Sequence, residues 1–351
     1  MDMSGLIWSE GLNKRVRSGD WLEQSISTVK KIEDCVAEEN TELAAQFVDY
    51  FMEEAKVCHL IYLSWFSSFY DWLIEREVPQ AKFQEIYELL AFPDGEIFDA
   101  GVGVPAKRWS VLGSKAGILA NELRGNGTKS DTAIEKLNSL RESWRQLHDR
   151  WVDLLSGLMT LAVDTEGESG LESMYRNALE PYISERYMVY DLREKSYSET
   201  LERNLYTSFE AMRGHLCGPQ RRGDIDFREH SDRWELSFDP CASGGRILRG
   251  DPIEETGSRC EPPYSFGVTE EEHDWAWNKK GVCYYCAHCC LALERIPAER
   301  WGHPVRVVDP PLYPQDVGGG EEKKCTWTIY KRLEDIPSEV YERIGLEKPI
   351  D

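Results

Sequence analysis

Long hydrophobic runs are missing from this sequence of 351 residues. The longest nearly apolar stretch runs from Val57 to Phe66, about half the length that a membrane-spanning helix needs. Residues 1–20 also contain no hydrophobic core of the kind found in a secretory signal. We therefore expect a cytoplasmic protein with no membrane partner.

Positive charge is scarce as well. The chain has 41 Lys and Arg against 63 Asp and Glu, which gives a net charge of −22. A nucleic-acid backbone or an anionic membrane surface repels such a chain, so we expect no nucleic-acid partner. The charge does not exclude a local basic pocket, and a small anionic molecule is the expected partner. Association with a second copy of the chain, as a homo-oligomer, stays open.

Several widespread catalytic motifs are absent. The sequence has no G-x-S-x-G, no H-E-x-x-H, no dinucleotide-binding glycine fingerprint and no paired E-x-x-H helices. These absences remove the common hydrolase, protease, dehydrogenase and ferritin-like interpretations. The material for a large core is present, because 41% of the residues are apolar and the chain has 12 Trp and 16 Tyr.

Helical periodicity dominates the first part of the chain. Apolar residues recur at helical spacing from Thr41 to Glu75 and from Ser130 to Val163, and two shorter helices fit residues 168–179 and 196–212. This pattern is typical of a helical bundle, which we expect over residues 1–216. The two long helices are expected to pack face to face through four buried aromatic residues: Trp65, Phe69, Trp144 and Trp151.

The apolar period becomes alternating after Gly223. Residues 225–228 and 234–238 predict a hairpin with a polar turn, and further strands are expected at residues 305–308 and 326–330. The whole chain is therefore predicted to be α+β. Its helical N-terminal region is followed by a smaller mixed α/β metal-binding region, rich in Cys and His, at residues 217–351.

Two segments of this second region have other signals. Gly and Pro are frequent over residues 239–272, which predicts a loop. A short helix is expected from Tyr285 to Arg295, and Pro297 should stop it.

Eight of the ten cysteines follow residue 216. In a reducing compartment they do not indicate a disulfide framework. The densest group is Cys283, Cys286, Cys289 and Cys290, with His288 among them. The Cys-x-x-Cys spacing lets two thiolates bind one tetrahedral metal, so Cys286 and Cys289 are predicted to bind zinc. Iron or an iron–sulfur cluster is the alternative.

The other metal ligands must come singly, because the sequence has no Cys pair at this spacing outside this cluster. Cys241, directly after the predicted hairpin, and His273 are the expected additional ligands. Cys283, His288 or Cys290 could replace one of the proposed ligands. A catalytic zinc, a structural zinc, buried free thiols and a redox pair all remain open.

Three residues are candidates for catalysis. His288 is expected to carry protons. Arg246 lies in a Gly-rich turn after a strand and is expected to hold a carboxylate or phosphate; the alternative is a solvated surface arginine. Asp239 opens the same turn. Two other histidines receive structural interpretations: His148 in core packing, and His215 in neutralising a helix C-terminus.

The segment Gly320 to Lys331 has a Gly that leads to Cys325 and then an alternating strand. It resembles the closing strand of the broad group that contains 4-vinyl reductase-like domains and L-2-amino-thiazoline-4-carboxylate hydrolase-like proteins. The helical entry with Gly167 and Glu168 before Leu171 is also similar. The resemblance covers the last half of the chain and implies an α+β ligand-binding domain with a small-molecule pocket, used for hydrolysis or for sensing.

Together these observations give two functional hypotheses. The first is a zinc-dependent hydrolase or lyase acting on a small anionic organic substrate, in which the metal polarises a bond or activates water. The alternative is a non-enzymatic small-molecule-binding or sensor protein with a structural zinc site. The residues do not name the substrate or the reaction.

Overall fold

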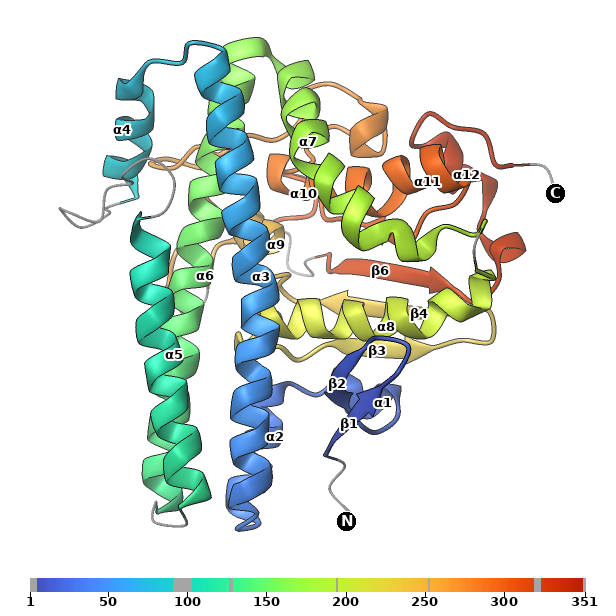
Figure 1. Ribbon diagram of the computed structural model, residues 1–351. Coiled ribbons are helices and arrows are strands. Elements are labelled where there is room, and N and C mark those ends of the chain that lie inside the picture. The colour runs from blue at the N-terminus through green and yellow to red at the C-terminus, as the bar shows by residue number, and fades with distance from the viewer. Residues whose placement is uncertain are drawn as a thin grey trace.

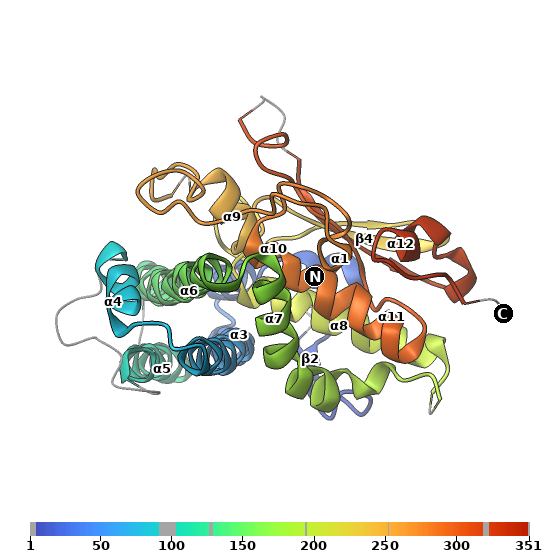
Figure 2. The ribbon, with the colours of Figure 1, turned by 90° about the horizontal axis from the view of Figure 1, so that it is seen from above.

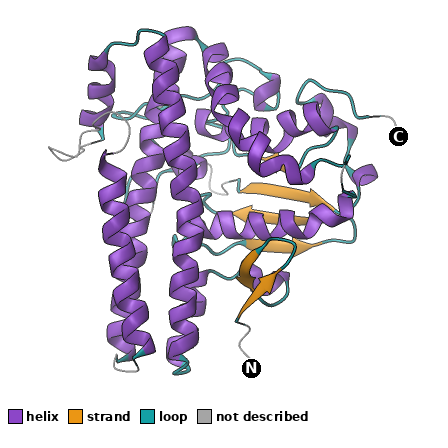
Figure 3. Ribbon diagram, viewed as in Figure 1, coloured by secondary structure: helices purple, strands orange, loops and turns teal. Residues whose placement is uncertain are grey.

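The computed structural model describes residues 5–90, 103–125, 129–193, 195–251, 253–318 and 323–349. Within them the chain is α+β, with a mostly helical N-terminal half and small sheets (Figure 1, Figure 3). None of the described helices combines the length and the apolar character needed to cross a membrane.

Three long helices stand side by side: α3 (Thr41–Glu75), α5 (Gly103–Arg124) and α6 (Ser130–Glu166) (Figure 2). The Asn40 side chain caps the first turn of α3 by accepting a hydrogen bond from the Leu43 N–H, and α3 ends four residues before Pro79. The predicted helices over residues 41–75 and 130–163 are confirmed. The remaining helical elements of this half are α1 (Trp21–Ser25), α2 (Thr28–Ala37), α4 (Gln80–Leu89), α7 (Glu168–Tyr182), η1 (Ile183–Tyr187), η2 (Met188–Tyr190) and α8 (Tyr197–Gly214).

The four aromatic residues predicted for the helix interface are all buried. Trp151 on α6 packs against α3, where its ring meets Tyr62 and Phe66. Trp65 of α3 turns instead toward α7 and lies edge-on to Tyr175. The long helices therefore do pack together, but α3 divides its aromatic residues between α6 and α7.

The main sheet is antiparallel with the order β3-β4-β6-β5. It consists of β3 (Asp226–Glu229), β4 (Arg233–Phe238), β5 (Val307–Asp309) and β6 (Cys325–Tyr330), which confirms the predicted hairpin. Every second side chain of β6 points into the core, beginning with Cys325 and Trp327. Helix α8 packs on the sheet through Phe209 against Phe227. A second hairpin, β1 (Leu6–Ser9) and β2 (Lys14–Arg17), lies in the region predicted to be helical.

Two predictions for the second region were wrong in part. The predicted loop at residues 239–272 contains the short helix α9 (Gly244–Arg249). Pro297 does not stop the helix that begins at residue 284, because a π-helical turn precedes it and places it at the start of a new helical segment, where its missing N–H is tolerated. The remaining elements are η3 (Asp274–Ala276), α10 (Tyr284–Cys289), η4 (Cys290–Arg295), α11 (Ile296–Trp301), η5 (Leu333–Asp335) and α12 (Ser338–Glu342).

The regions expected at residues 1–216 and 217–351 share one continuous hydrophobic core. Side chains of α3, α6 and α7 belong to the same buried cluster as side chains of α10 and β6. The contact between the two regions is therefore core packing, and residues from both can meet in one site.

Helix packing gives a stability test with a matched control. A Cβ at Gly214 of α8 would lie 2.5 Å from the backbone oxygen of Glu54 on α3, whereas a Cβ at Gly113 of α5 would meet nothing within 4 Å. We expect Gly214→Ala to lower the free energy of unfolding by about 1–3 kcal/mol. Gly113→Ala should raise it by up to about 1 kcal/mol, because Ala is the better helix former. Urea denaturation measures both, and equal effects would contradict this packing of α8 on α3.

Candidate functional site

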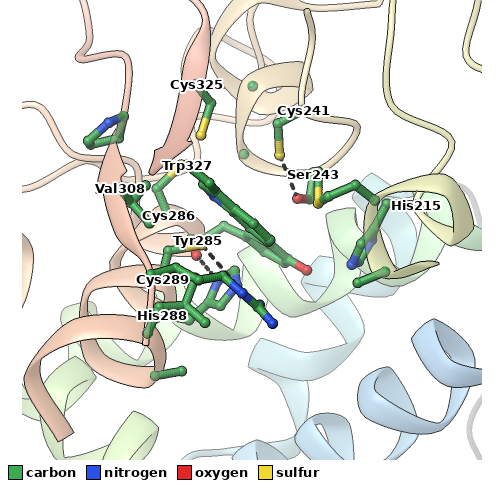
Figure 4. A pocket seen from close by; sticks show the side chains of 18 of the residues that line it. His215, Cys241, Ser243, Tyr285, Cys286, His288, Cys289, Val308, Cys325 and Trp327 are labelled. Atoms are coloured by element: carbon green, nitrogen blue, oxygen red, sulfur yellow. Dashed lines mark hydrogen bonds between the residues drawn. The ribbon is translucent and has the colours of Figure 1, made fainter. Parts of the chain in front are cut away.

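A pocket of about 100 Å³ lies where the two regions meet (Figure 4). Its walls come from α3, η1, α8, the turn before α9, α10, η4, β5 and β6. Chemically active side chains are concentrated there: Tyr62, His215, Cys241, Tyr285, Cys286, His288, Cys289, Arg306 and Cys325.

Four cysteines from three parts of the chain face this pocket. Cys241 follows β4, Cys286 and Cys289 lie on α10, and Cys325 begins β6 (Figure 4). Burial and the nearby Cys241 thiol raise the pKa of Cys289 and of Cys325 well above its ordinary value. These two thiols are therefore protonated unless a cation stabilises the thiolate form.

The Gly-rich turn is shaped to receive α10. A Cβ at Gly244 would overlap the sulfur of Cys286, so a residue without a side chain is required there. The turn expected to hold a phosphate or carboxylate therefore packs against the Cys286 side chain.

Cys283 caps the N-terminus of α10, and Cys286 is three residues further along the helix. The two thiols lie close enough for each to affect the pKa of the other. Burial alone would raise the pKa of Cys283, but the neighbouring Cys286 thiol and the N–H groups of Cys286 and Tyr285 lower it overall. The neighbouring Cys283 thiol and burial raise the pKa of Cys286.

Three of the four predicted zinc ligands line the pocket, and His273 does not. Its Nε2 pairs with Glu168, and its ring stacks on Trp275 with centroids 4.7 Å apart. His273 is thus held at another place by a carboxylate and an aromatic partner. Among the residues that the structure describes, a different group has three potential metal-binding atoms within 4.8 Å of one another: Asp149, Asp251 and Glu254.

That acidic group already has its counter-ions. Arg221 pairs with Asp149 at 2.6 Å and also binds Asp251, and Arg145 lies 2.9 Å from Glu254. The carboxylates belong to a network of ion pairs between α6 and the segment after α9. Their geometry is explained without a metal.

Two predicted catalytic residues also lie in ion pairs outside the pocket lining. Arg246 is completely buried and binds the side chain of Asp153, so the prediction that it holds a substrate anion has to be corrected. Asp239 pairs with Arg249 at 2.7 Å. Both side chains already have an opposite charge, which removes the reason to expect them to bind substrate.

The cation that does face the pocket is Arg306, which is 5% exposed. Its Nε donates to Asn204 Oδ1 at 2.7 Å, its Nη2 donates to Thr207 Oγ1 at 2.9 Å, and its guanidinium lies 5.2 Å from the ring centre of Trp327. No carboxylate in the described part of the chain lies within ion-pair distance of it. Burying a guanidinium without a counter-ion costs several kcal/mol, and a bound anion would remove that cost.

A chain of polar groups leads from the pocket wall into the core. The Tyr62 hydroxyl lies 3.0 Å from His148 Nε2 and 2.8 Å from His215 Nδ1, and these two nitrogens are 3.0 Å apart. His148 Nδ1 lies 2.8 Å from Asp149 Oδ1. Tyr285 lies close enough to Tyr62 for each to affect the pKa of the other, so two pocket-lining tyrosines stand at the start of this chain.

The protonation state of this chain follows from burial and charge. Burial lowers the pKa of His148 to about 4 and that of His215 well below its ordinary value, so both are neutral at pH 7. Burial would raise the pKa of Asp149, but Arg246 and Arg221 hold it well below its usual range. Asp149 therefore accepts the Nδ1–H of His148, and the Nε2 of His148 is left as an acceptor for the Tyr62 hydroxyl.

His288 lies beside the cysteines. Its Nδ1–H donates to the Tyr285 carbonyl, and its Nε2 is 3.3 Å from the sulfur of Cys289. Burial lowers the pKa of His288 to about 4, so the ring is neutral and its Nε2 can accept the thiol proton of Cys289.

Sequence reasoning missed Arg306 and the Tyr62–His148–Asp149 chain. A charged residue between valines in a predicted strand was a usable signal for Arg306. The adjacent His148 and Asp149 in an apolar helical stripe were another, because a buried acid beside a histidine fixes its tautomer. Nothing local, however, indicates that His148 meets Tyr62, which is 86 residues away.

Comparisons with family models, with curated proteins and with solved structures found no match for this chain. The resemblance to the 4-vinyl reductase-like group therefore stays an expectation. Of the segment that carries it, residues 320–322 lie outside the described residues, and residues 325–330 form β6.

The buried histidines predict how stability depends on pH. The pKa of His148 and that of His59 are lowered by burial from 6.5 to about 4. Between these two pH values the histidines bind protons in the unfolded chain but not in the folded protein. The free energy of unfolding should therefore fall as the pH falls from 6.5 to about 4. Above pH 6.5 the two groups contribute no slope.

Urea denaturation across this pH range measures the effect, and His148→Gln should flatten the slope. Comparing the variants near pH 7 separates the cost of lost packing from the loss of titration. An unchanged slope in His148→Gln would contradict a neutral, buried His148.

Proposed function

We propose that the chain is a zinc-dependent hydrolase or lyase that acts on a small organic anion bound in the cysteine-lined pocket. The single observation that carries this proposal is Arg306, a buried guanidinium that faces the pocket and hydrogen-bonds to neutral groups. A carboxylate or phosphate of the substrate supplies the missing negative charge.

The walls of the pocket favour a substrate with a planar or apolar portion. Aromatic side chains form much of its surface, and Trp327 lies next to the Arg306 guanidinium. An anionic head group on Arg306 leaves the rest of the substrate against these rings and directed toward the thiols.

The thiols of Cys241, Cys286 and Cys289 are the proposed zinc ligands. Zinc binds cysteine as thiolate, so binding would release the protons that burial now keeps on these sulfurs. His288 Nε2 is placed to accept a hydrogen bond from the Cys289 thiol. With three protein ligands the fourth position stays open, and a zinc ion there would polarise a bond of the substrate or activate water.

Tyr62 is the proposed proton donor and acceptor at the reacting atoms. Its side chain lines the pocket, and its hydroxyl is held by His148 Nε2, whose ring Asp149 orients. The residues proposed for acid–base chemistry therefore lie on α3 and α6. His288 has the narrower proposed role of accepting a hydrogen bond from the metal ligand Cys289.

Cys325 supports the second candidate, a ligand-binding or sensor protein with a structural zinc. It is a fourth thiol in the same pocket, and it could take the role of fourth ligand that was expected for His273. Four thiolates would close the coordination of zinc, as in structural sites. The number of cysteines that hold the metal therefore separates the enzyme from the sensor.

Anion binding is tested with benzoate, a planar carboxylate, by calorimetric titration of the purified protein. Arg306→Gln should weaken benzoate binding by about 10–100-fold, because a charge-assisted hydrogen bond is lost. Arg176→Gln is the matched control, since Arg176 pairs with Glu172 and Glu299 outside the pocket lining. Equal affinities of the wild type and Arg306→Gln would contradict the proposed role of Arg306.

Metal binding is tested by elemental analysis of protein purified without chelators. We expect zinc in the wild type, its loss from Cys286→Ser and from Cys289→Ser, and its retention in Cys290→Ser. Cys290 is the control because its sulfur contacts the Asp274 carbonyl and does not line the pocket. Iron in place of zinc would indicate the alternative metal or an iron–sulfur cluster.

Two further variants decide between the functions. Retention of zinc in Cys325→Ser supports an open, catalytic coordination, whereas its loss supports the structural site. His288→Ala should keep the metal, and loss of zinc would make His288 itself a ligand. A wild-type protein without any metal would contradict the zinc-dependent function.

A further inference from the structure

We infer that Cys283 and Cys286 form a reversible disulfide when a peroxide enters the pocket. The pair is thus a site of oxidative modification, and one of its members, Cys286, is part of the pocket wall. The disulfide itself follows from the geometry of the two residues, whereas its effect on a metal rests on the proposed function.

The helix start brings the two sulfurs together. Cys283 is the N-cap of α10, with extended backbone angles of φ −52° and ψ 132°, and Cys286 occupies the third helical position. The side chain of an N-cap residue folds back over the second and third residues of the helix. This position directs the Cys283 sulfur toward the first turn of α10, which contains Cys286 and in which the Ala287 N–H donates to the Cys283 carbonyl at 3.2 Å.

The other thiols of the cluster are less well placed to pair. Cys286 and Cys289 both lie within the regular turns of α10, where side chains three residues apart share one face of the helix but project outward from it and do not fold back as an N-cap side chain does. Cys290 is completely buried on a different side, with its sulfur against the Asp274 carbonyl. The N-cap conformation of Cys283 is therefore the feature that selects this pair.

The oxidant reaches the pair through Cys286, which lines the pocket, while Cys283 is buried behind it. A cavity of about 100 Å³ admits a molecule of the size of hydrogen peroxide. Cys260 is the nearest competitor, because its thiol is electrostatically coupled to Cys283 and is less buried than either member of the pair.

The reaction needs only peroxide as the co-reactant. The Cys286 sulfur, after passing its proton to the leaving oxygen, attacks one peroxide oxygen; the O–O bond breaks, and a sulfenic acid and water form. The Cys283 sulfur then attacks the Cys286 sulfur, the S–S bond forms, and the sulfenic oxygen leaves as a second water. Two thiols lose two electrons and two protons, and one peroxide is reduced to two waters. A dithiol reductant reverses the change.

Oxidation and metal binding compete for one sulfur. Cys286 is a proposed zinc ligand, and a sulfur held in a disulfide cannot act as a thiolate ligand. If the proposed function holds, oxidation of the pair releases the metal, and reduction restores the site.

The experiment uses the full chain freed of metal by a chelator and treated with hydrogen peroxide. After the free thiols are alkylated, chymotrypsin cleaves behind Tyr284 and Tyr285, which stand between the two cysteines. The expected result is a pair of peptides joined only through Cys283 and Cys286, separated by dithiothreitol, with a mass lower by about 2 Da for the two lost hydrogens. Alkylatable Cys283 and Cys286 after peroxide, or a bond from either to Cys260, Cys241 or Cys289, would overturn the inference.

Three variants sharpen the result. Cys283→Ser should abolish the linked peptides, and Cys260→Ser and Cys290→Ser should leave them intact. Persistence of the link when Cys283 is replaced, or its loss in Cys260→Ser, would overturn the assignment of the pair.

A second measurement on zinc-loaded protein tests the coupling to the metal. Peroxide should release zinc from the wild type, and much less from Cys283→Ser, which keeps Cys286 and Cys289. Zinc that stays bound while the disulfide forms would overturn the coupling. Protein that never takes up zinc, yet forms the disulfide, would show failure of the proposed function and leave the assigned pair intact.

Discussion

The buried carboxylate of Asp149 is the charge on which the geometry of the site depends. Its side chain is almost completely buried, and it stays anionic because Arg221 at 2.6 Å, Arg145 at 3.0 Å and Arg246 at 3.6 Å surround it. A buried ion of this kind is tolerated only with such partners. Because Asp149 remains charged, it fixes the ring of His148, and the free Nε2 of that ring meets the Tyr62 hydroxyl at the pocket wall. A protonated Asp149 would leave this tautomer without its support.

The same ion pairs hold the later part of the chain against α6. Arg246 belongs to α9, which directly follows the segment that carries Cys241, and it contacts both Asp149 and Asp153. With α9 held in this way, Gly244 lies against the sulfur of Cys286. The positions of Cys241 and Cys286 in the pocket thus follow from charges that are themselves outside its lining. Arg246, which the sequence suggested as a substrate ligand, contributes instead by anchoring the turn.

How far the sequence predicts the molecule depends on the range of the interaction. Helices α3 and α6 and the hairpin of β3 and β4 were predicted, because their apolar periods are local properties of the chain. The N-terminal hairpin has only four residues in each strand, and α9 has two glycines in its first turn, so neither has a strong local pattern. In the site, the spacing of Cys286 and Cys289 indicated their shared location. His273 was placed wrongly because Glu168, from the other region, holds it. Arg306, Tyr62 and His148 were missed because each depends on partners far away in the sequence.

The charges of the pocket link the two halves of the proposed chemistry. Arg306 brings one positive charge, and the thiols are neutral until a metal converts them to thiolates. A divalent zinc with three thiolates would have a net charge of −1. The single positive charge of Arg306 would offset this charge, and its guanidinium would still attract an anion. With four thiolates the net charge would be −2, and an anionic substrate beside them would meet repulsion that a single guanidinium cannot offset. Within this proposal, therefore, Cys325 decides which ligand charge the pocket accepts. If Cys325 does not bind the zinc, the coordination is open and an anionic substrate can bind; if it does bind the zinc, an anionic substrate is repelled.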